Sequence, residues 1–232
     1  MIRDAILDFF FPPKCPFCGK ILESKKPVCD KCEDTLPFID EKACRICGRP
    51  IEETSHEICS MCRNEKIYFE HAFIPLVYKA KAKDAILALK SSHPYYAKGF
   101  AYLVANKIIS SGHYSPFDMI TFVPQNRKSF RRRGYNQAEL IAKELAKFLA
   151  LPCKSTLRRT DDGLPQHTLN IAQRRENVKK CFFPTNEKFS GTVLLVDDIY
   201  TTGATANHCA KLLCKMGFDR VYLATALIRT ED

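Results

Sequence analysis

Hydrophobic positions follow different patterns on the two sides of about residue 70. Beyond that point, short apolar runs alternate with longer stretches in which apolar residues recur every three or four positions. The runs predict strands, and the longer stretches predict helices. The predicted strands cover 72–79, 117–124, 193–196 and 220–228, and the predicted helices cover 81–90, 95–111, 138–150 and 204–216. Because the two kinds of element alternate, we predict an α/β domain with a parallel sheet.

The N-terminal part instead carries paired cysteines. Eight of the twelve cysteines form C-x-x-C pairs, and the two halves, with CPFCGK and CRICGR, are an internal repeat. Four cysteines in each half are a common ligand set for structural zinc. The sequence shows no secretion signal, so metal binding is favoured over disulfide bonds. We predict two structural Zn²⁺ ions, in sequential ribbons or, as the alternative, in a cross-braced arrangement. The ligands would be Cys15, Cys18, Cys29, Cys32, Cys44, Cys47, Cys59 and Cys62.

We expect two domains, an N-terminal helix with a double zinc-ribbon domain at 1–70 and an α/β domain at 71–232. The apolar but charge-interrupted residues 1–13 favour a short amphipathic helix that docks on the fold, with peripheral membrane contact as the alternative. No apolar run approaches the ~18 residues that span a bilayer, so we expect no transmembrane segment. We therefore expect a cytoplasmic protein, with a peripheral position at the inner face of the cell membrane as the alternative.

Positive charge is concentrated in the second predicted domain. Residues 1–70 carry 11 Lys/Arg against 13 Asp/Glu, a balance of −2. Residues 71–232 carry 25 against 13, a balance of +12. A field of this sign attracts polyanions, such as a pyrophosphate-bearing ligand or a nucleic-acid backbone.

The most informative stretch is Val193–Thr205, which reads VLLVDDIYTTGAT. Its apolar residues predict a buried strand, which two carboxylates, Asp197 and Asp198, follow. A small-residue turn then opens a helix, and free N–H groups at a helix start favour a phosphate. Carboxylates repel phosphate, so these two suit sugar hydroxyls or a metal ion. A ligand with a 5′-phosphate and free ribose hydroxyls fits both halves, and an ordinary strand before a capped helix is the alternative.

This stretch resembles the phosphoribosyl-pyrophosphate (PRPP) motif of the type I phosphoribosyltransferases. The resemblance implies that Asp197 and Asp198 hold the ribose 2′- and 3′-hydroxyls, that the loop binds the 5′-phosphate, and that Mg²⁺ accompanies PRPP. A basic loop at 127–133 would face the pyrophosphate. The further PRPP candidates are Thr201, Thr202, Gly203, Ala204, Thr205 and Arg127.

Two basic blocks are candidate nucleic-acid sites. The first, QNRKSFRRRGYNQ at 125–137, follows a predicted strand, so we expect a loop at the ligand edge of the sheet. The second lies in the polar stretch 157–182, which we expect to be a lid or a polyanion track. Clustered cations beside an aromatic ring suit single-stranded nucleic acid, and a solvated surface is the alternative. The candidates are Arg131, Arg132, Arg133, Tyr135, Asn136, Gln137, Arg158, Arg159, Arg174 and Arg175.

Three features together resemble the ComF family of bacterial competence proteins: the paired cysteines, RRRGYNQ at 131–137, and L-R-R…Q-x-x-L…R-R-x-N at 157–177. The resemblance spans nearly the whole chain. It implies a parallel-sheet α/β domain of the type I phosphoribosyltransferase kind with a small N-terminal zinc-ribbon domain. It further implies handling of single-stranded DNA in competence, with proteins of the DNA-uptake machinery as candidate partners. The alternative function is an active phosphoribosyltransferase that uses PRPP and an unidentified acceptor.

Overall fold

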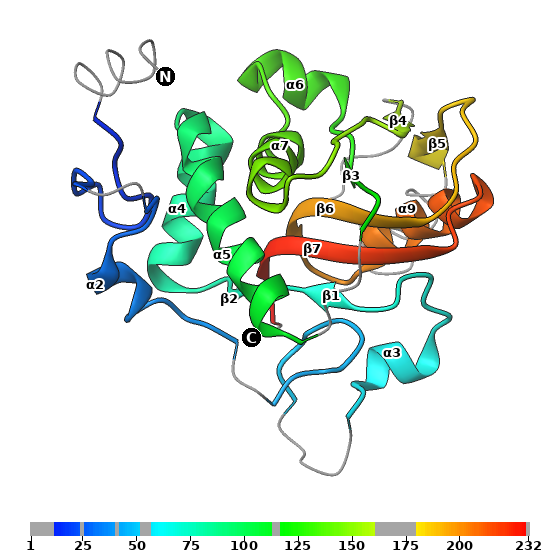
Figure 1. Ribbon diagram of the computed structural model, residues 1–232, viewed down its shortest axis with the longest axis horizontal. Helices are drawn as coiled ribbons and strands as arrows, with labels where there is room; N and C mark the ends of the chain where they lie inside the picture. Colours follow the sequence, from blue (N-terminus) through cyan, green and yellow to red (C-terminus); the bar gives the residue numbers. More distant parts are fainter. Residues whose placement is uncertain are drawn as a thin grey trace.

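The structure, a computed structural model, describes residues 12–23, 26–39, 42–51, 57–112, 117–160 and 180–230. Its centre is a parallel sheet in which β6 lies between β3 and β7 (Figure 1). On its other side, β7 pairs with both β1 and β2. The strands are β1 (Ala72–Phe73), β2 (Leu76–Val77), β3 (Met119–Phe122), β6 (Thr192–Tyr200) and β7 (Arg220–Ile228).

The strand predicted at 72–79 is split in two, which corrects that prediction. β1 and β2 keep one register on β7, so they are two pieces of a single edge. Pro75 lies between them and has no N–H group to donate to β7. Its carbonyl accepts a hydrogen bond of 2.9 Å from the Ile39 N–H. The interruption therefore gives the N-terminal part a point of attachment to the sheet.

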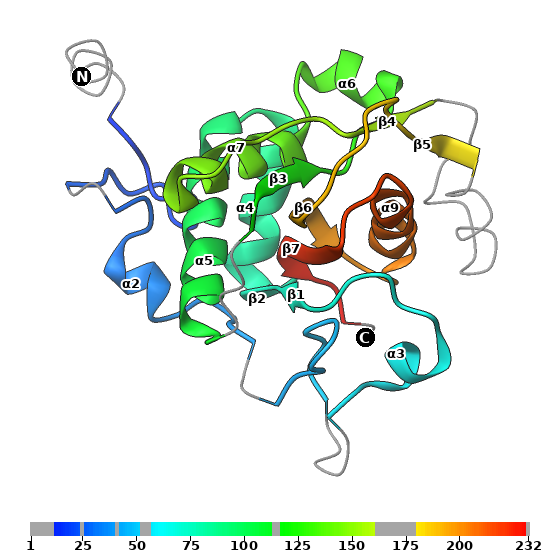
Figure 2. The ribbon, with the colours of Figure 1, turned by 45° about the vertical axis from the view of Figure 1, so that its right-hand side comes forward.

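Helices cover both faces of the sheet (Figures 1 and 2). One face carries α4 (Ala80–Ser91), the 3₁₀ helix η1 (Pro94–Tyr96), α5 (Ala97–Ser110) and α7 (Gln137–Leu149), and the other carries α9 (Ala204–Lys215). Alternate residues of a strand point to opposite faces. Leu194 of β6 accordingly packs in one core with Phe100, whereas Leu195 packs in another with Leu213. The predicted parallel α/β architecture is confirmed.

Residues 127–133 form a helix, α6 (Arg127–Arg133), where we predicted a loop. Asn126 caps its start, because its side chain accepts a hydrogen bond of 2.7 Å from the Ser129 N–H. Gly134 ends it with a φ of 81°, a left-handed conformation that glycine adopts without strain. A capping asparagine and a terminal glycine are helix signals, and they outweigh the lack of an apolar face.

The polar stretch predicted at 157–182 begins and ends in paired strands. β4 (Leu157–Arg159) and β5 (Phe182–Pro184) form an antiparallel ribbon apart from the main sheet. Residues 161–179, with Arg174 and Arg175, lie outside the described residues. The lid or polyanion track therefore stays a prediction. The helix predicted at 1–13 also falls almost wholly outside the described residues.

The N-terminal part contains two short helices, α2 (Asp30–Glu33) and α3 (Ser60–Asn64). We call residues 12–39 the first ribbon and residues 42–69 the second ribbon. Figures 1 and 2 show the first ribbon on the side of α4 and α5, and α3 of the second ribbon below α9. The domain boundary at residues 70 and 71 stays a prediction. In the described part of the chain, no helix has the length and apolar character needed to cross a membrane.

Candidate functional site

The paired cysteines gather into two separate tetrads. In each tetrad the sulfur atoms all lie within 4.8 Å of one another. Cys18 Sγ and Cys29 Sγ are 3.7 Å apart in the first tetrad, and Cys47 Sγ and Cys59 Sγ are 3.6 Å apart in the second. Zn–S bonds of about 2.3 Å in a tetrahedron place sulfurs about 3.8 Å apart, so both tetrads fit structural zinc. The first contains Cys15, Cys18, Cys29 and Cys32, and the second contains Cys44, Cys47, Cys59 and Cys62, which is the sequential arrangement.

Both tetrads are built on the same turn. Gly19 and Gly48 follow the second cysteine of their tetrads with φ values of 71° and 69°. The N–H of the first cysteine donates to the Lys20 carbonyl at 2.8 Å in the first ribbon and to the Arg49 carbonyl at 2.7 Å in the second. Lys20 and Arg49 therefore hold equivalent positions in the two ribbons.

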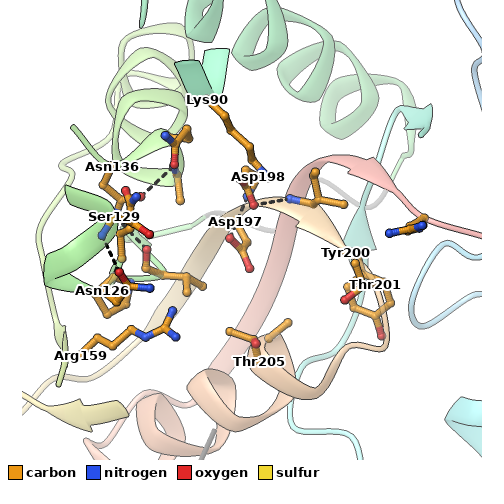
Figure 3. Close-up of a pocket in the computed structure, with 18 of the residues that line it drawn as sticks. Lys90, Asn126, Ser129, Asn136, Arg159, Asp197, Asp198, Tyr200, Thr201 and Thr205 are labelled. Atoms are coloured by element: carbon orange, nitrogen blue, oxygen red, sulfur yellow. Dashed lines mark hydrogen bonds and ion pairs between the residues drawn. The ribbon is translucent and has the colours of Figure 1, made fainter. Parts of the chain in front are cut away.

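A cleft of about 420 Å³ opens at the C-terminal ends of β3, β6 and β7 (Figure 3). This is the edge at which open α/β sheets bind ligands. Four basic and two acidic side chains line it, so its balance is positive and favours an anion. They are Lys90, Arg133, Arg159, Arg229, Asp197 and Asp198.

The two carboxylates are neighbours in the chain but face different partners. Asp198 Oδ2 forms an ion pair of 2.7 Å with Lys90 Nζ at the end of α4, whereas Asp197 lies on the side of Arg159 and Thr205 (Figure 3). Burial raises the pKa of Asp197, and the adjacent Asp198 charge raises it further. Burial acts on Asp198 in the same direction, but the Lys90 ammonium outweighs it and lowers the pKa of Asp198. Asp198 is thus the more firmly ionised carboxylate.

The loop after β6 turns at Gly203 and leads into α9. Gly203 has a φ of 77°, and a Cβ there would lie 2.2 Å from the hydroxyl oxygen of Tyr200. The turn therefore requires glycine. Thr205 and Ala206, at the start of α9, line the cleft. The N–H groups at the start of this 12-residue helix favour a negatively charged ligand group.

The opposite wall comes from α6, the start of α7 and β4. Asn136 is buried, and its side chain bonds backbone groups at the start of α7 and after β3. Gln137 is also buried, and its Oε1 accepts a hydrogen bond of 3.1 Å from Arg133 Nη1. Gln137 Nε2 and Arg159 Nε have no hydrogen-bond partner among the described residues. An acceptor atom of a ligand in the cleft would accept hydrogen bonds from these two N–H donors.

The cleft brings together part of the predicted PRPP set. Thr202 lies instead beside the second ribbon, where it lines a small gap with Met61 and Cys62. Arg127 and Ala204 are not among the described lining residues. The predicted PRPP residues that line the cleft are Asp197, Asp198, Thr201, Gly203 and Thr205.

The predicted nucleic-acid residues divide between the cleft and the surface. Tyr135 is half-buried, and its hydroxyl donates a hydrogen bond of 2.7 Å to the Leu89 carbonyl, so the fold already uses this side chain. The exposed candidates are Arg131, Arg132 and Arg158, and the cleft-lining candidates are Arg133, Asn136, Gln137 and Arg159.

Sequence reasoning missed several lining residues, among them Lys90, Ser129 and Arg229. Lys90 lies in the last turn of α4, where cations are common, so the local pattern did not single it out. Arg229 directly follows β7, and its place after a predicted strand was a usable signal for the ligand edge.

Known proteins resemble both parts of the chain. Residues 6–63 match the family model of the double zinc ribbon domain. The chain is 28% identical to Competence protein F of Haemophilus influenzae, over 90% of this chain and 82% of that protein. It is also 28% identical to DNA utilization protein YhgH of Escherichia coli, over 82% of this chain and 85% of that protein. These relatives and the double zinc ribbon confirm the predicted resemblance to the ComF family.

Among solved structures, an adenine phosphoribosyltransferase resembles this ComF-like chain with a TM-score of 0.38 and 15% identity, over 60% of this chain and 72% of that one. The strand order, the two tetrads and the match to the double zinc ribbon domain confirm the predicted fold class of a parallel-sheet α/β domain with a small N-terminal zinc-ribbon domain.

The ComF-like chain also presents a basic surface outside the cleft lining. Arg127, Lys128, Arg131 and Arg132 of α6 are exposed, and Phe130 among them is 46% exposed. We call these five side chains the α6 surface. Phe130 was not predicted, because nothing in the basic run showed that it would face outward.

Proposed function

We propose that this ComF-like protein handles single-stranded DNA in competence and that its cleft binds PRPP or a related ribose phosphate. The observation that carries the proposal is the cleft itself, where a carboxylate pair and the start of α9 meet within a positive lining. The competence role is supported by the relatives, which are named Competence protein F and DNA utilization protein.

The two sides of the cleft suit the two ends of a phosphorylated ribose. Asp197 and Asp198 would accept hydrogen bonds from ribose hydroxyls, and the N–H groups at the start of α9 would hold the 5′-phosphate. The cations of the opposite wall, with Gln137 Nε2, would face the pyrophosphate. Mg²⁺ bound with PRPP would neutralise part of that charge, and carboxylate oxygens are the ligand atoms that such a cation takes.

The α6 surface suits a single strand of DNA. Its four cations would neutralise backbone phosphates, and the exposed ring of Phe130 would stack on a base. Phe130 takes the stacking role that we expected of Tyr135, since the hydroxyl of Tyr135 is engaged in the fold. Stacking and charge neutralisation do not read base edges, so binding should show little sequence preference and should weaken steeply with salt.

The test of the cleft is calorimetry of the purified full chain with PRPP–Mg²⁺, with a labelled oligonucleotide, and with both in competition. Replacing Asp197 and Asp198 together with alanine should lower PRPP affinity by about two decades, because several hydroxyl hydrogen bonds are removed. Oligonucleotide affinity should stay as in the wild type. Equal PRPP binding by the wild type and the double variant would show that the cleft is not a ribose phosphate site.

The test of the α6 surface uses Arg131→Ala with Arg132→Ala and leaves Arg133 in place, because Arg133 lines the cleft. The slope of log K against log salt should become shallower by about 0.7 for each backbone phosphate that the variant no longer neutralises. Phe130→Ala should weaken binding by about 1–3 kcal/mol, because its ring no longer stacks on a base. Phe148→Ala is the control, since Phe148 is 40% exposed on α7. An unchanged affinity and slope in the arginine variant would remove the α6 surface from DNA handling.

A further inference from the structure

The second ribbon contacts the loop that forms the phosphate side of the cleft. Arg49 Nη2 donates a hydrogen bond of 2.7 Å to the Thr201 carbonyl, and Nη1 donates one of 3.3 Å to the Arg229 carbonyl. Thr201 and Arg229 directly follow β6 and β7, and both line the cleft. One guanidinium from the second ribbon therefore joins the ends of the two central strands at the ligand edge.

The zinc turn fixes the position of Arg49. Its carbonyl accepts a hydrogen bond of 2.7 Å from the Cys44 N–H, and the Gly48 N–H donates one of 2.8 Å to the Cys44 carbonyl. Cys44 is a member of the second tetrad. The backbone of Arg49 is thus part of the turn that presents a sulfur to the metal.

The second ribbon also contacts the residues on either side of this loop. Asn207, in the first turn of α9, accepts a hydrogen bond of 2.8 Å from the Tyr68 N–H and donates one of 2.9 Å to the Lys66 carbonyl. The buried ring of Tyr200 packs edge-on against Phe69, with ring centroids 6.5 Å apart. The second ribbon therefore contacts the strand end before the loop, the loop itself and the helix after it.

We propose that the second ribbon is a structural support of the ligand loop and that Arg49 is its positioning residue. Held in place by the zinc turn, the guanidinium fixes the Thr201 and Arg229 carbonyls, and the loop N–H groups then face the cleft before a ligand arrives. A loop that is ordered in advance loses less conformational entropy on binding, so affinity is higher. The effect on ligand affinity rests on the proposed ribose phosphate site, whereas the ordering of the loop does not.

The experiment compares Arg49→Ala and Arg49→Lys with Lys20→Ala in the full chain. Lys20 is the matched control, because it holds the equivalent position in the first ribbon and is exposed. Three quantities are measured: zinc content, amide hydrogen exchange at 201–207, and affinity for PRPP–Mg²⁺. With zinc retained, Arg49→Ala should speed exchange in the loop and weaken PRPP binding about tenfold, the cost of a charge-assisted hydrogen bond. Arg49→Lys should restore part of both, and Lys20→Ala should match the wild type.

Equal loop exchange in Arg49→Ala and Lys20→Ala would overturn the proposal. If Arg49→Ala loses zinc, Asn207→Ala decides instead, because it removes the support from the side of α9 and leaves the zinc turn unaltered. It should speed exchange in the loop, and unchanged exchange would overturn the proposal. A wild type that does not bind PRPP would contradict the proposed function alone, since hydrogen exchange still reports on the support by Arg49.

Discussion

The two zinc ribbons share a turn and a ligand set but support different parts of the molecule. The first packs against α5, where the Phe17 ring meets the Phe100 ring edge-on at 5.4 Å. The second packs against the β6–α9 loop, which Arg49 contacts directly. Their burial differs as well, because Cys18 in the first tetrad is exposed, whereas each cysteine of the second is at most 9% exposed.

The formation of a zinc site and the role of the ribbon that holds it depend on different features of the molecule. The turn geometry is nearly the same in both ribbons, so it does not distinguish their roles. The role follows from the surface on which each ribbon lies. Lys20 and Arg49 illustrate this, since one is exposed and the other reaches two carbonyls at the cleft.

Removing one zinc site at a time should give the largest difference between the ribbons. The variants are Cys44→Ser with Cys47→Ser, and Cys15→Ser with Cys18→Ser. Zinc contributes roughly 10–16 kcal/mol in isolated zinc-finger peptides, so a ribbon without its ion should unfold. We expect one zinc per chain in each variant by elemental analysis. The second-ribbon variant should lose PRPP binding, whereas the first-ribbon variant should retain it.

Hydrogen exchange should locate the two effects. Loss of the second site should expose amides of the β6–α9 loop, and loss of the first should expose the start of α5. If both variants lost PRPP binding to the same extent, the ribbons would not have separate roles. A chain that contains less than one zinc before any substitution would show that the tetrads are not metal sites.

A smaller effect should follow from loosening the first ribbon without touching its metal. A Cβ added at Gly99 of α5 would lie 2.5 Å from Pro16 Cγ, so Gly99→Ala forces the ribbon and the helix apart. Overpacking of this kind costs about 1–3 kcal/mol, although alanine returns up to about 1 kcal/mol of helix propensity. We expect a lower melting temperature and unchanged PRPP affinity. Lys98→Ala, at an exposed position of α5, is the control.

Thermal melting and calorimetry of Gly99→Ala test whether the packing of the first ribbon on α5 affects the ligand site. A lower melting temperature with full PRPP affinity would place the first ribbon outside the ligand site. A loss of PRPP affinity as large as that of Arg49→Ala would contradict the separation, because it would mean that packing on α5 also orders the cleft.

Sequence alone predicts the elements whose signals are local. β7 covers 220–228 as predicted, because this segment is apolar except for Arg220 and Thr225, and α7 differs by a single residue at each end because its apolar face is regular. The prediction failed at α6, because this helix is defined by the caps at Asn126 and Gly134 and not by an apolar face. It also failed at Pro75, where a missing N–H group splits a strand without changing its register.

The candidate site likewise contains residues that the sequence predicts and residues that it does not. Asp197 and Asp198 could be found because the apolar run, the carboxylates and the glycine turn are consecutive in the sequence. The strand itself does not end at Val196 as predicted, since β6 continues through both carboxylates to Tyr200. Lys90 and Arg49 could not, because their partners lie far along the chain and the partners of Arg49 are carbonyls. Every residue supplies a carbonyl, so such an interaction leaves no pattern in the sequence. The support of the loop is therefore visible only in three dimensions.

The smallest expected effect concerns the carboxylates beside the loop that the second ribbon holds. Burial and the Asp198 charge raise the pKa of Asp197 above its value in the unfolded chain. The folded state then binds more protons between the two pKa values, so this group's contribution to stability is present at low pH and is lost as pH rises. Asp197→Asn removes that loss. The variant should melt higher than the wild type at neutral pH, by about 1 kcal/mol or roughly 2–4 °C, and the difference should vanish on acidification.

Asp198→Asn should have the opposite sign. The Lys90 ammonium outweighs burial and lowers the pKa of Asp198, so this group stabilises the fold above its unfolded pKa and stops doing so as pH falls through its folded pKa. Its asparagine variant should melt lower than the wild type at neutral pH, and this difference too should vanish in acid. Melting both variants between about pH 2 and pH 8 checks the signs and the loss of both differences in acid, with Asp84→Asn on the exposed side of α4 as the control. Shifts of the same sign at neutral pH would mean that Lys90 does not set the two carboxylates apart. Because the pair adjoins the β6–α9 loop and not α5, hydrogen exchange in the first ribbon should be the same in all three variants.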